Sequence, residues 1–164
     1  MRIAITGHRG LPAATERLVD AAIREQLAAY EGPDLVGVSN LADGADQIFA
    51  QAVLDGGGRL EVIVPAARYR DGLPDSAHAA YDALLEKASH IDRLDRIEST
   101  EQAHMEASNA MLARADRLFA VWDGKPARGY GGTADVVTEA RRRGLPVTII
   151  WPEGASREET TPAL

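Results

Sequence analysis

Short, almost wholly apolar runs alternate along this chain with longer segments of helical periodicity. The apolar runs occupy residues 2–6 (RIAIT), 35–38, 60–64 (LEVIV), 118–122 (LFAVW) and 147–151. Helical spacing of apolar side chains marks residues 11–30, 45–54, 76–88, 101–115 and 134–143. Apolar strands separated by helices are typical of a parallel sheet covered on both faces. The pattern predicts a doubly wound α/β fold around a mostly parallel sheet of roughly five to six strands.

The length of 164 residues, 45% of them hydrophobic, suits a single domain with one core. We expect a Rossmann-like domain over residues 1–152 and a polar tail at 153–164 that frays from it. The stretch 66–97 is less regular than the rest. Its topology stays open, with room for an extra short strand within 90–97.

The composition argues against several kinds of site. The absence of cysteine removes disulfides, thiolate metal sites and a cysteine nucleophile. His8, His78, His90 and His104 lack metal-ligand spacing, so we expect no metal site. No stretch reaches the roughly twenty apolar residues of a membrane span, and Met1 leads straight into a strand. We therefore expect a cytoplasmic protein without membrane contact. The net charge of −7 disfavours a nucleic-acid partner.

The first candidate binding segment follows the first predicted strand. Ligands of open parallel sheets bind beyond the carboxyl ends of the strands, where the strand order reverses. The sequence there is Thr6-Gly7-His8-Arg9-Gly10. Glycines such as Gly7 permit close approach of a ligand to the backbone, and Arg9 can form paired hydrogen bonds to a phosphate. His8 can add a donor or a general base. We expect this turn to bind an anion.

The second candidate segment, residues 39–46, follows the second predicted strand. Small and polar side chains there, among them Ser39, Asn40 and Gly44, keep the floor of the crevice low. Asp43 or Asp46 can either cap the next helix or bind ribose hydroxyls. Both alternatives stay open on the sequence alone. We expect the loop to contact the ligand.

The third segment, residues 123–135, is the most specific feature of the chain. Three of four consecutive positions are glycine, and Thr133 follows them at a predicted helix start. Free amides and the helix dipole favour an anion there, and the threonine hydroxyl is a further donor. Asp123 opens the segment, and Lys125 and Arg128 add positive charge. The sequence matches neither GxxxxGK[ST] nor GxGxxG, so it predicts a phosphate-binding loop of another kind.

These residues carry a family resemblance. GYGGTADVVTEA at 129–140, between LFAVWDG and RRRGLPVTII, resembles the SLOG superfamily of Rossmann-like nucleotide-binding domains. That superfamily includes the LOG phosphoribohydrolases and the DNA-processing protein DprA. The stretch 39–65 is similar to the DprA loop, helix and strand, and ITGHRG at 5–10 resembles the start of small bacterial and phage members. The resemblance spans roughly residues 1–152.

The resemblance implies a ligand that carries a nucleoside phosphate. Gly131, Gly132 and Thr133 take the phosphate-binding position of the LOG motif PGGxGTxxE. The motif carboxylate falls on Val136, which leaves Asp135 and Glu139 beside that position as catalytic candidates. An N-glycosidic hydrolase needs such a carboxylate.

Two classes of function therefore remain open. One is a binding module or sensor for a nucleotide or nucleotide-derived phosphate. The other is a phosphoribohydrolase of LOG type, or a transferase similar to nucleoside deoxyribosyltransferases. The sequence indicates no cofactor besides a nucleotide ligand. Helix surfaces rich in alanine and leucine, together with the resemblance, predict a homodimer or larger homo-oligomer.

Overall fold

The computed structural model of the chain describes residues 1–158 and contains one six-stranded parallel sheet. The strands are β1 (Arg2–Gly7), β2 (Val36–Ser39), β3 (Arg59–Val64), β4 (His90–Arg93), β5 (Arg117–Val121) and β6 (Val147–Ile150). The helices are α1 (Ala13–Leu27), α2 (Ala45–Asp55), α3 (Asp75–Lys87), α4 (Glu101–Arg114) and α5 (Thr133–Arg142). A single 3-10 turn, Arg70–Gly72, precedes α3.

The strand order is β4-β3-β2-β1-β5-β6, and every neighbouring pair is parallel. From β1 the chain builds outward through β2 and β3 to β4, then returns to the other side of β1 to add β5 and β6. The order therefore reverses between β1 and β5. This is the place where open parallel sheets form their ligand crevice.

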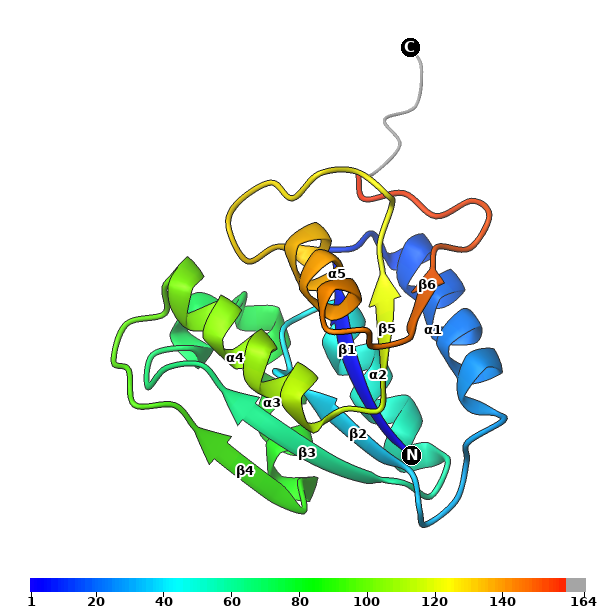
Figure 1. The fold of residues 1–164 in the computed structure, drawn as a ribbon, viewed down its shortest axis with the longest axis horizontal. Coiled ribbons are helices and arrows are strands. Elements are labelled where there is room, and N and C mark those ends of the chain that lie inside the picture. Colours follow the sequence, from blue (N-terminus) through cyan, green and yellow to red (C-terminus); the bar gives the residue numbers. More distant parts are fainter. Residues whose placement is uncertain (159–164) are drawn as a thin grey trace.

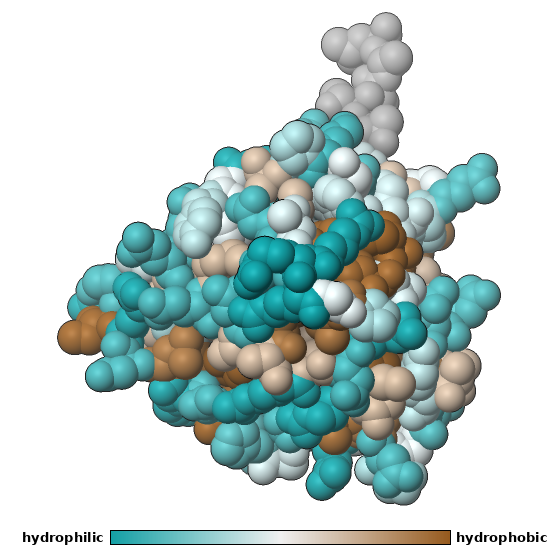
Figure 2. Space-filling view, viewed as in Figure 1, coloured by the Kyte–Doolittle hydropathy of each residue, from teal (hydrophilic) through white to brown (hydrophobic). Residues whose placement is uncertain are grey.

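Helices cover both faces of the sheet (Figure 1). On one face, α1 and α2 pack over β1 and β5 with Ile5, Phe49 and Phe119 at the centre, and α3 packs beside α2. On the other face, α4 and α5 bury Met111 and Val136 against the sheet. The near surface over α4 and α5 is mostly hydrophilic or neutral, with scattered hydrophobic patches (Figure 2). Within residues 1–158, no helix has the length and apolarity that a membrane span requires.

The fold class predicted from the sequence is confirmed, because the apolar runs form the strands of one parallel sheet. The stretch 66–97, whose topology the sequence left undecided, contains the 3-10 turn, α3 and β4. β4 is the extra short strand that the sequence left room for, and it pairs with β3 at the edge of the sheet. Its side chains are largely exposed, which explains why it lacks the apolar signature of the inner strands.

The segment after β6 is held against α1, so the expected fraying is wrong for residues up to Glu158. Thr15 Oγ1 donates to the carbonyl oxygen of Ser156 at 2.8 Å, and the Ser156 N–H donates back to Thr15 Oγ1 at 3.0 Å. Thr15 itself is only 2% exposed. This pair of contacts joins positions 141 residues apart, a relation that no local pattern reveals. Residues 159–164 of the predicted tail lie outside the described residues.

Candidate functional site

A cavity of about 350 Å³ lies at the carboxyl ends of the central strands, beside the point where the strand order reverses. Its wall combines all three segments singled out in the sequence with side chains from α4 and from the segment after β6. The residues from the first two segments are Thr6, Gly7, His8, Arg9, Asn40, Ala42 and Asp46. Those from the third are Lys125 and residues 127–134. The remaining lining residues include Pro65 and Tyr69 after β3, His104, Ser108 and Met111 on α4, and Arg157 after β6.

Gly7 and Gly44 allow the first two loops to pack closely. A Cβ on Gly7 would lie 2.4 Å from that of Ala45, and one on Gly44 would lie 2.6 Å from the carbonyl oxygen of His8. Gly44 also has a φ of +85°, which favours glycine. Gly7 lines the cavity and Gly44 does not. Both glycines are therefore needed for loop-to-loop packing, whatever the cavity holds.

His8 is buried, and its imidazole is engaged by the protein. The Asp123 N–H donates to His8 Nε2 at 3.0 Å, so Nε2 is unprotonated and the ring proton is on Nδ1. Burial and then the charge of Arg157 lower the pKa of His8, against the opposing effect of Asp123. The Asp123 carboxylate lies 3.2 Å from the same nitrogen and would form an ion pair only with a protonated ring. His8 is thus a neutral wall residue at neutral pH.

Asp43 connects the first two loops. Its carboxylate accepts from Arg9 Nε at 2.8 Å and from the Gly10 N–H at 2.9 Å. It caps no helix, because Gly44 holds the N-cap position of α2 without a side-chain hydrogen bond. Asp43 lies outside the cavity wall, whereas Arg9 lies in it. The pair holds the Arg9 side chain at the cavity, where Arg9 Nη2 also donates to the Gly72 carbonyl oxygen at 3.5 Å.

The β2–α2 loop is held by internal hydrogen bonds. The Leu41 N–H donates to Ser39 Oγ at 2.9 Å, and Asn40 Nδ2 donates to the Ile63 carbonyl at 2.8 Å. Leu41 has a φ of +58°, in the left-handed region that non-glycine residues seldom adopt. Ser39 is fully buried outside the cavity, and Asn40 lies in its wall. The loop is therefore a rigid part of the wall.

The floor of the cavity carries Asp46, from the second predicted segment, together with polar side chains that the sequence did not indicate as ligand contacts. Burial raises the pKa of Asp46 to about 7, although the Ala42 N–H donates to its carboxylate at 3.3 Å. Tyr69 and His104 lie beside this floor, with their ring centroids 5.5 Å apart, edge to face. Ser99 Oγ is 2.7 Å from His104 Nε2. Their segments are far apart in sequence, so only the fold reveals the cluster.

At the glycine turn and the start of α5, some backbone amides are engaged by the protein and others are free. The Gly131 N–H donates to Asp135 Oδ2 at 2.9 Å, and the Gly132 N–H donates to the Gly129 carbonyl at 3.2 Å. Among the hydrogen bonds of residues 1–158, none engages the amide of Thr133 or Ala134, and both residues line the cavity. Unpaired amides of a first helical turn favour an anion. Two amides of the predicted phosphate cradle are thus taken up by the protein, while those of Gly129, Tyr130, Thr133 and Ala134 make no hydrogen bond within residues 1–158.

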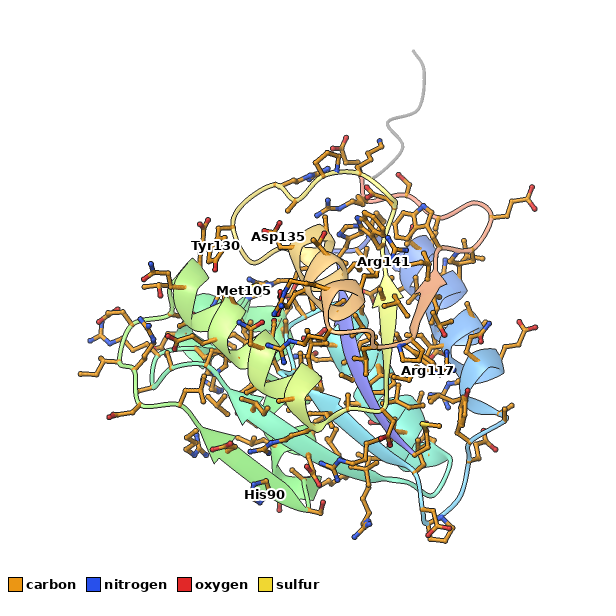
Figure 3. The ribbon with its side chains drawn as sticks, in the orientation of Figure 1. His90, Met105, Arg117, Tyr130, Asp135 and Arg141 are labelled. Carbon is orange, nitrogen blue, oxygen red and sulfur yellow. The ribbon has the colours of Figure 1, made fainter. Side chains whose placement is uncertain are left out.

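Neither catalytic candidate places its carboxylate free in the cavity. Asp135, labelled at the start of α5 in Figure 3, accepts the Gly131 N–H and is absent from the wall. Glu139 also lies outside the wall, and hydrogen bonds from Arg142 and Arg143 lower its pKa to about 2. Val136 is buried in the core at 1% exposure.

Positive charge gathers in the wall although the protein is acidic. Lys125, Arg128 and Arg157 face the cavity together with Arg9, and Asp46 is the one carboxylate among its lining residues. Burial and the neighbouring Arg128 lower the pKa of Arg157 from its usual value. Within residues 1–158, no three histidine or acidic side chains are grouped to hold a metal ion. The arrangement suits an anionic ligand.

Comparison with known proteins agrees on the architecture. No protein-family model and no curated protein sequence matches the chain. The chain is similar to DNA processing protein A from Helicobacter pylori, described for its single-stranded DNA binding mode, with a TM-score of 0.67 and 16% identity over 95% of this chain and 68% of the other. It is similar to DprA from Streptococcus pneumoniae with a TM-score of 0.65 and 17% identity over 93% of this chain and 51% of that one.

Two further structures share the fold at lower similarity. The protein TM1055 has a TM-score of 0.58 and 19% identity, covering 89% of this chain and 71% of the other. The Moco carrier protein of Chlamydomonas rheinhardtii has a TM-score of 0.54 and 12% identity, covering 90% and 74%. These structures confirm the Rossmann-like fold that the sequence predicts. Identities this low carry no information on the ligand.

Proposed function

We propose that the cavity at the carboxyl ends of β1 and β5 binds a nucleotide or a nucleotide-derived phosphate, and that the protein acts as a binding module or sensor. The observation that carries the proposal is the charge of the wall. Four basic side chains and one carboxylate line the cavity of a protein whose net charge is −7. A local excess of positive charge in an acidic protein favours a specific anion over general polyanion binding.

The cavity wall contains two kinds of group that fit such a ligand. The free amides of Thr133 and Ala134 and the basic side chains suit a phosphate. Tyr69, His104 and Met111 add flat or apolar surface that suits a base. The volume of about 350 Å³ is in the range of small-molecule sites.

Calorimetric titration with AMP, GMP, CMP and UMP tests the proposal. We expect at least one monophosphate to bind saturably, and its nucleoside to bind at least tenfold more weakly, because a tenfold change corresponds to about 1.4 kcal/mol. Folded protein that binds none of the four would contradict the proposal.

Turnover is the alternative that the same ligands can test. A hydrolase of LOG type would release free base, which chromatography of the incubated mixtures detects. We expect none, because Val136 occupies the carboxylate position and the nearby Asp135 and Glu139 are engaged by other groups. Sustained base release that Asp135→Asn abolishes would instead establish an enzyme.

Single-stranded DNA is the alternative ligand suggested by the DprA likeness in fold. Its binding would require the basic groups of the cavity to follow a backbone of many phosphates. Fluorescence anisotropy with a labelled thymidine oligomer distinguishes the two ligands. We expect a monophosphate to bind and the DNA oligomer to bind no more tightly than the monophosphate.

The assembly of the protein into a homodimer or larger homo-oligomer, predicted from the sequence, is a separate proposal. Light scattering, which measures the mass of the particle in solution, tests it.

A further inference from the structure

We infer that Arg157, carried by the segment after β6, binds the anionic group of the ligand, and that the contact between Thr15 and Ser156 positions it. The inference rests on the proposed function, because it assigns a residue to the phosphate of the bound nucleotide. It also gives the polar tail, expected to fray, a part in the binding site.

The first observation is an unpaired polar group in the cavity wall. Within residues 1–158, three buried side-chain atoms lack a hydrogen-bond partner, namely Asn109 Oδ1, Arg117 Nε and Arg157 Nε. Of these residues, Arg157 alone lines the cavity. A buried N–H of a guanidinium without an acceptor is unfavourable. The two terminal nitrogens of Arg157 also make no hydrogen bond within residues 1–158 and are not fully buried, so a ligand oxygen in the cavity can accept from them.

The second observation is that the nearby carboxylates are engaged elsewhere. Glu158 lies 3.4 Å from an amino nitrogen of Arg128, the next basic residue of the wall. Asp123 accepts the Lys125 N–H at 3.0 Å and lies 3.2 Å from His8. Of the two arginines that face the cavity, Arg128 is thus paired with Glu158, whereas Arg157 forms no ion pair among residues 1–158. An incoming phosphate would find Arg157 unpaired and could compete with Glu158 for Arg128.

The third observation is that the backbone on both sides of Arg157 is fixed. Ser156 exchanges two hydrogen bonds with Thr15 of α1, at 2.8 and 3.0 Å. The Ser156 hydroxyl also donates to the Glu158 carbonyl at 2.9 Å and accepts the Glu158 N–H at 3.2 Å. Such preorganisation lowers the entropic cost of binding through a long side chain. Thr15 does not line the cavity, so it acts as a positioning residue.

The ligand class that follows is a nucleoside 5′-phosphate. Its phosphate would lie between the Arg157 guanidinium and the free amides at the start of α5. A planar guanidinium can donate two parallel hydrogen bonds to phosphate oxygens, and a neutral side chain of similar length cannot replace that charge. The nucleoside part would not contact Arg157. Removal of the arginine should therefore affect nucleotides and spare nucleosides.

Calorimetry with Arg157→Gln tests the assignment, using whichever of AMP, GMP, CMP and UMP binds the wild type most tightly, and the matching nucleoside. We expect at least a tenfold loss for the nucleotide and less than a twofold change for the nucleoside. Arg141→Gln is the matched control, because Arg141 is exposed on α5, outside the cavity wall, and the change in charge is the same (Figure 3). It should leave both affinities unchanged.

A second variant tests the positioning role. Thr15→Val keeps the shape of the side chain but removes both contacts to Ser156, so the nucleotide affinity should fall at least threefold. In the Arg157→Gln background the same change should have no further effect, which a general loss of fold would not produce. Equal nucleotide affinity of Arg157→Gln and wild type would overturn the inference alone. A wild type that binds no monophosphate would overturn both the inference and the proposed function.

Discussion

The backbone N–H of Asp123 donates a 3.0 Å hydrogen bond to Nε2 of His8 and joins the turn after β1 to the loop after β5. These two loops flank the place where the strand order reverses. An N–H group cannot accept a hydrogen bond, so the imidazole in this contact is neutral and carries its proton on Nδ1. His8, which the sequence predicts as a donor or a general base, thus also connects two walls of the cavity.

The protonation of His8 follows from this contact and can be measured. Burial, then Arg157, lowers the pKa of His8 below 6.5, so the folded protein keeps the ring neutral where the unfolded chain takes up a proton. The stability that His8 contributes is present above about pH 6.5 and is lost as the pH falls. Nitrogen NMR at about pH 6.5 should show the neutral Nδ1–H form. An imidazolium spectrum at that pH would refute this assignment. Arg157→Gln should raise the pKa of His8.

Substitutions at Gly44 and Gly124 form a matched pair that tests how closely the loops pack. Their φ angles are +85° and +82°, but a Cβ on Gly44 would meet the His8 carbonyl at 2.6 Å, while one on Gly124 would meet nothing within 4 Å. Gly124→Ala should cost about 1 kcal/mol, the backbone cost alone. Gly44→Ala should cost about 3 kcal/mol or more, since the clash adds to it. Urea denaturation measures both, and equal losses would show that the two loops do not pack closely.

Asp46 should make the stability depend on pH. Its pKa is raised by burial from 3.8 to about 7, so the folded state retains a proton that the unfolded chain has released. Stability therefore falls as the pH rises from about 4 to 7, by about 4 kcal/mol in total. Asp46→Asn avoids this ionisation and keeps an oxygen to accept the Ala42 N–H. It should stabilise the protein above about pH 8 and have little effect near pH 4. A gain of equal size at both pH values in urea denaturation would rule out the ionisation as its source.

Thr133 allows one free amide of α5, its own, to be tested separately. Proline is tolerated at the first position of a helix, and Gly132 before it is extended, with φ −70° and ψ 176°. Thr133→Pro therefore removes the amide donor and leaves α5 able to form. We expect it to weaken monophosphate binding about tenfold, the effect of one hydrogen bond to a charged group. Thr133→Ala, which retains the amide, is the control and should lose about twofold or less, because it lacks only the hydroxyl. Similar affinities for both variants would exclude the amide as a ligand group.

The fold could be predicted from the sequence because the pattern that marks each strand and helix is local. Each inner strand is an apolar run, and each helix shows its own periodicity, so their alternation predicts a parallel sheet. The position of the cavity followed from the rule on strand ends. β4 alone among the strands was left open, because an edge strand does not need an apolar run.

The site was predicted in outline, and its individual groups were not. The N–H of Gly131 in the glycine turn donates to the carboxylate of Asp135 in α5. A sequence motif does not show such a pairing. The sequence left Asp43 between helix capping and ribose binding and did not reveal its hydrogen bond with Arg9. Arg157 was missed because its place depends on Thr15, far away in the sequence. Long-range contacts of this kind need the folded chain.

An amide-resolved NMR titration tests the central claim most directly, because it locates the ligand without changing the protein. The titrant is the nucleoside monophosphate that binds most tightly in calorimetry. The account predicts that the largest shifts occur at the Thr133 and Ala134 amides and at the Nε of Arg157. Shifts confined to another surface would contradict it, for example shifts in a second groove that residues of α1, α2 and α3 line, among them Arg17, Gln51 and Leu84. A spectrum that does not change would also contradict it.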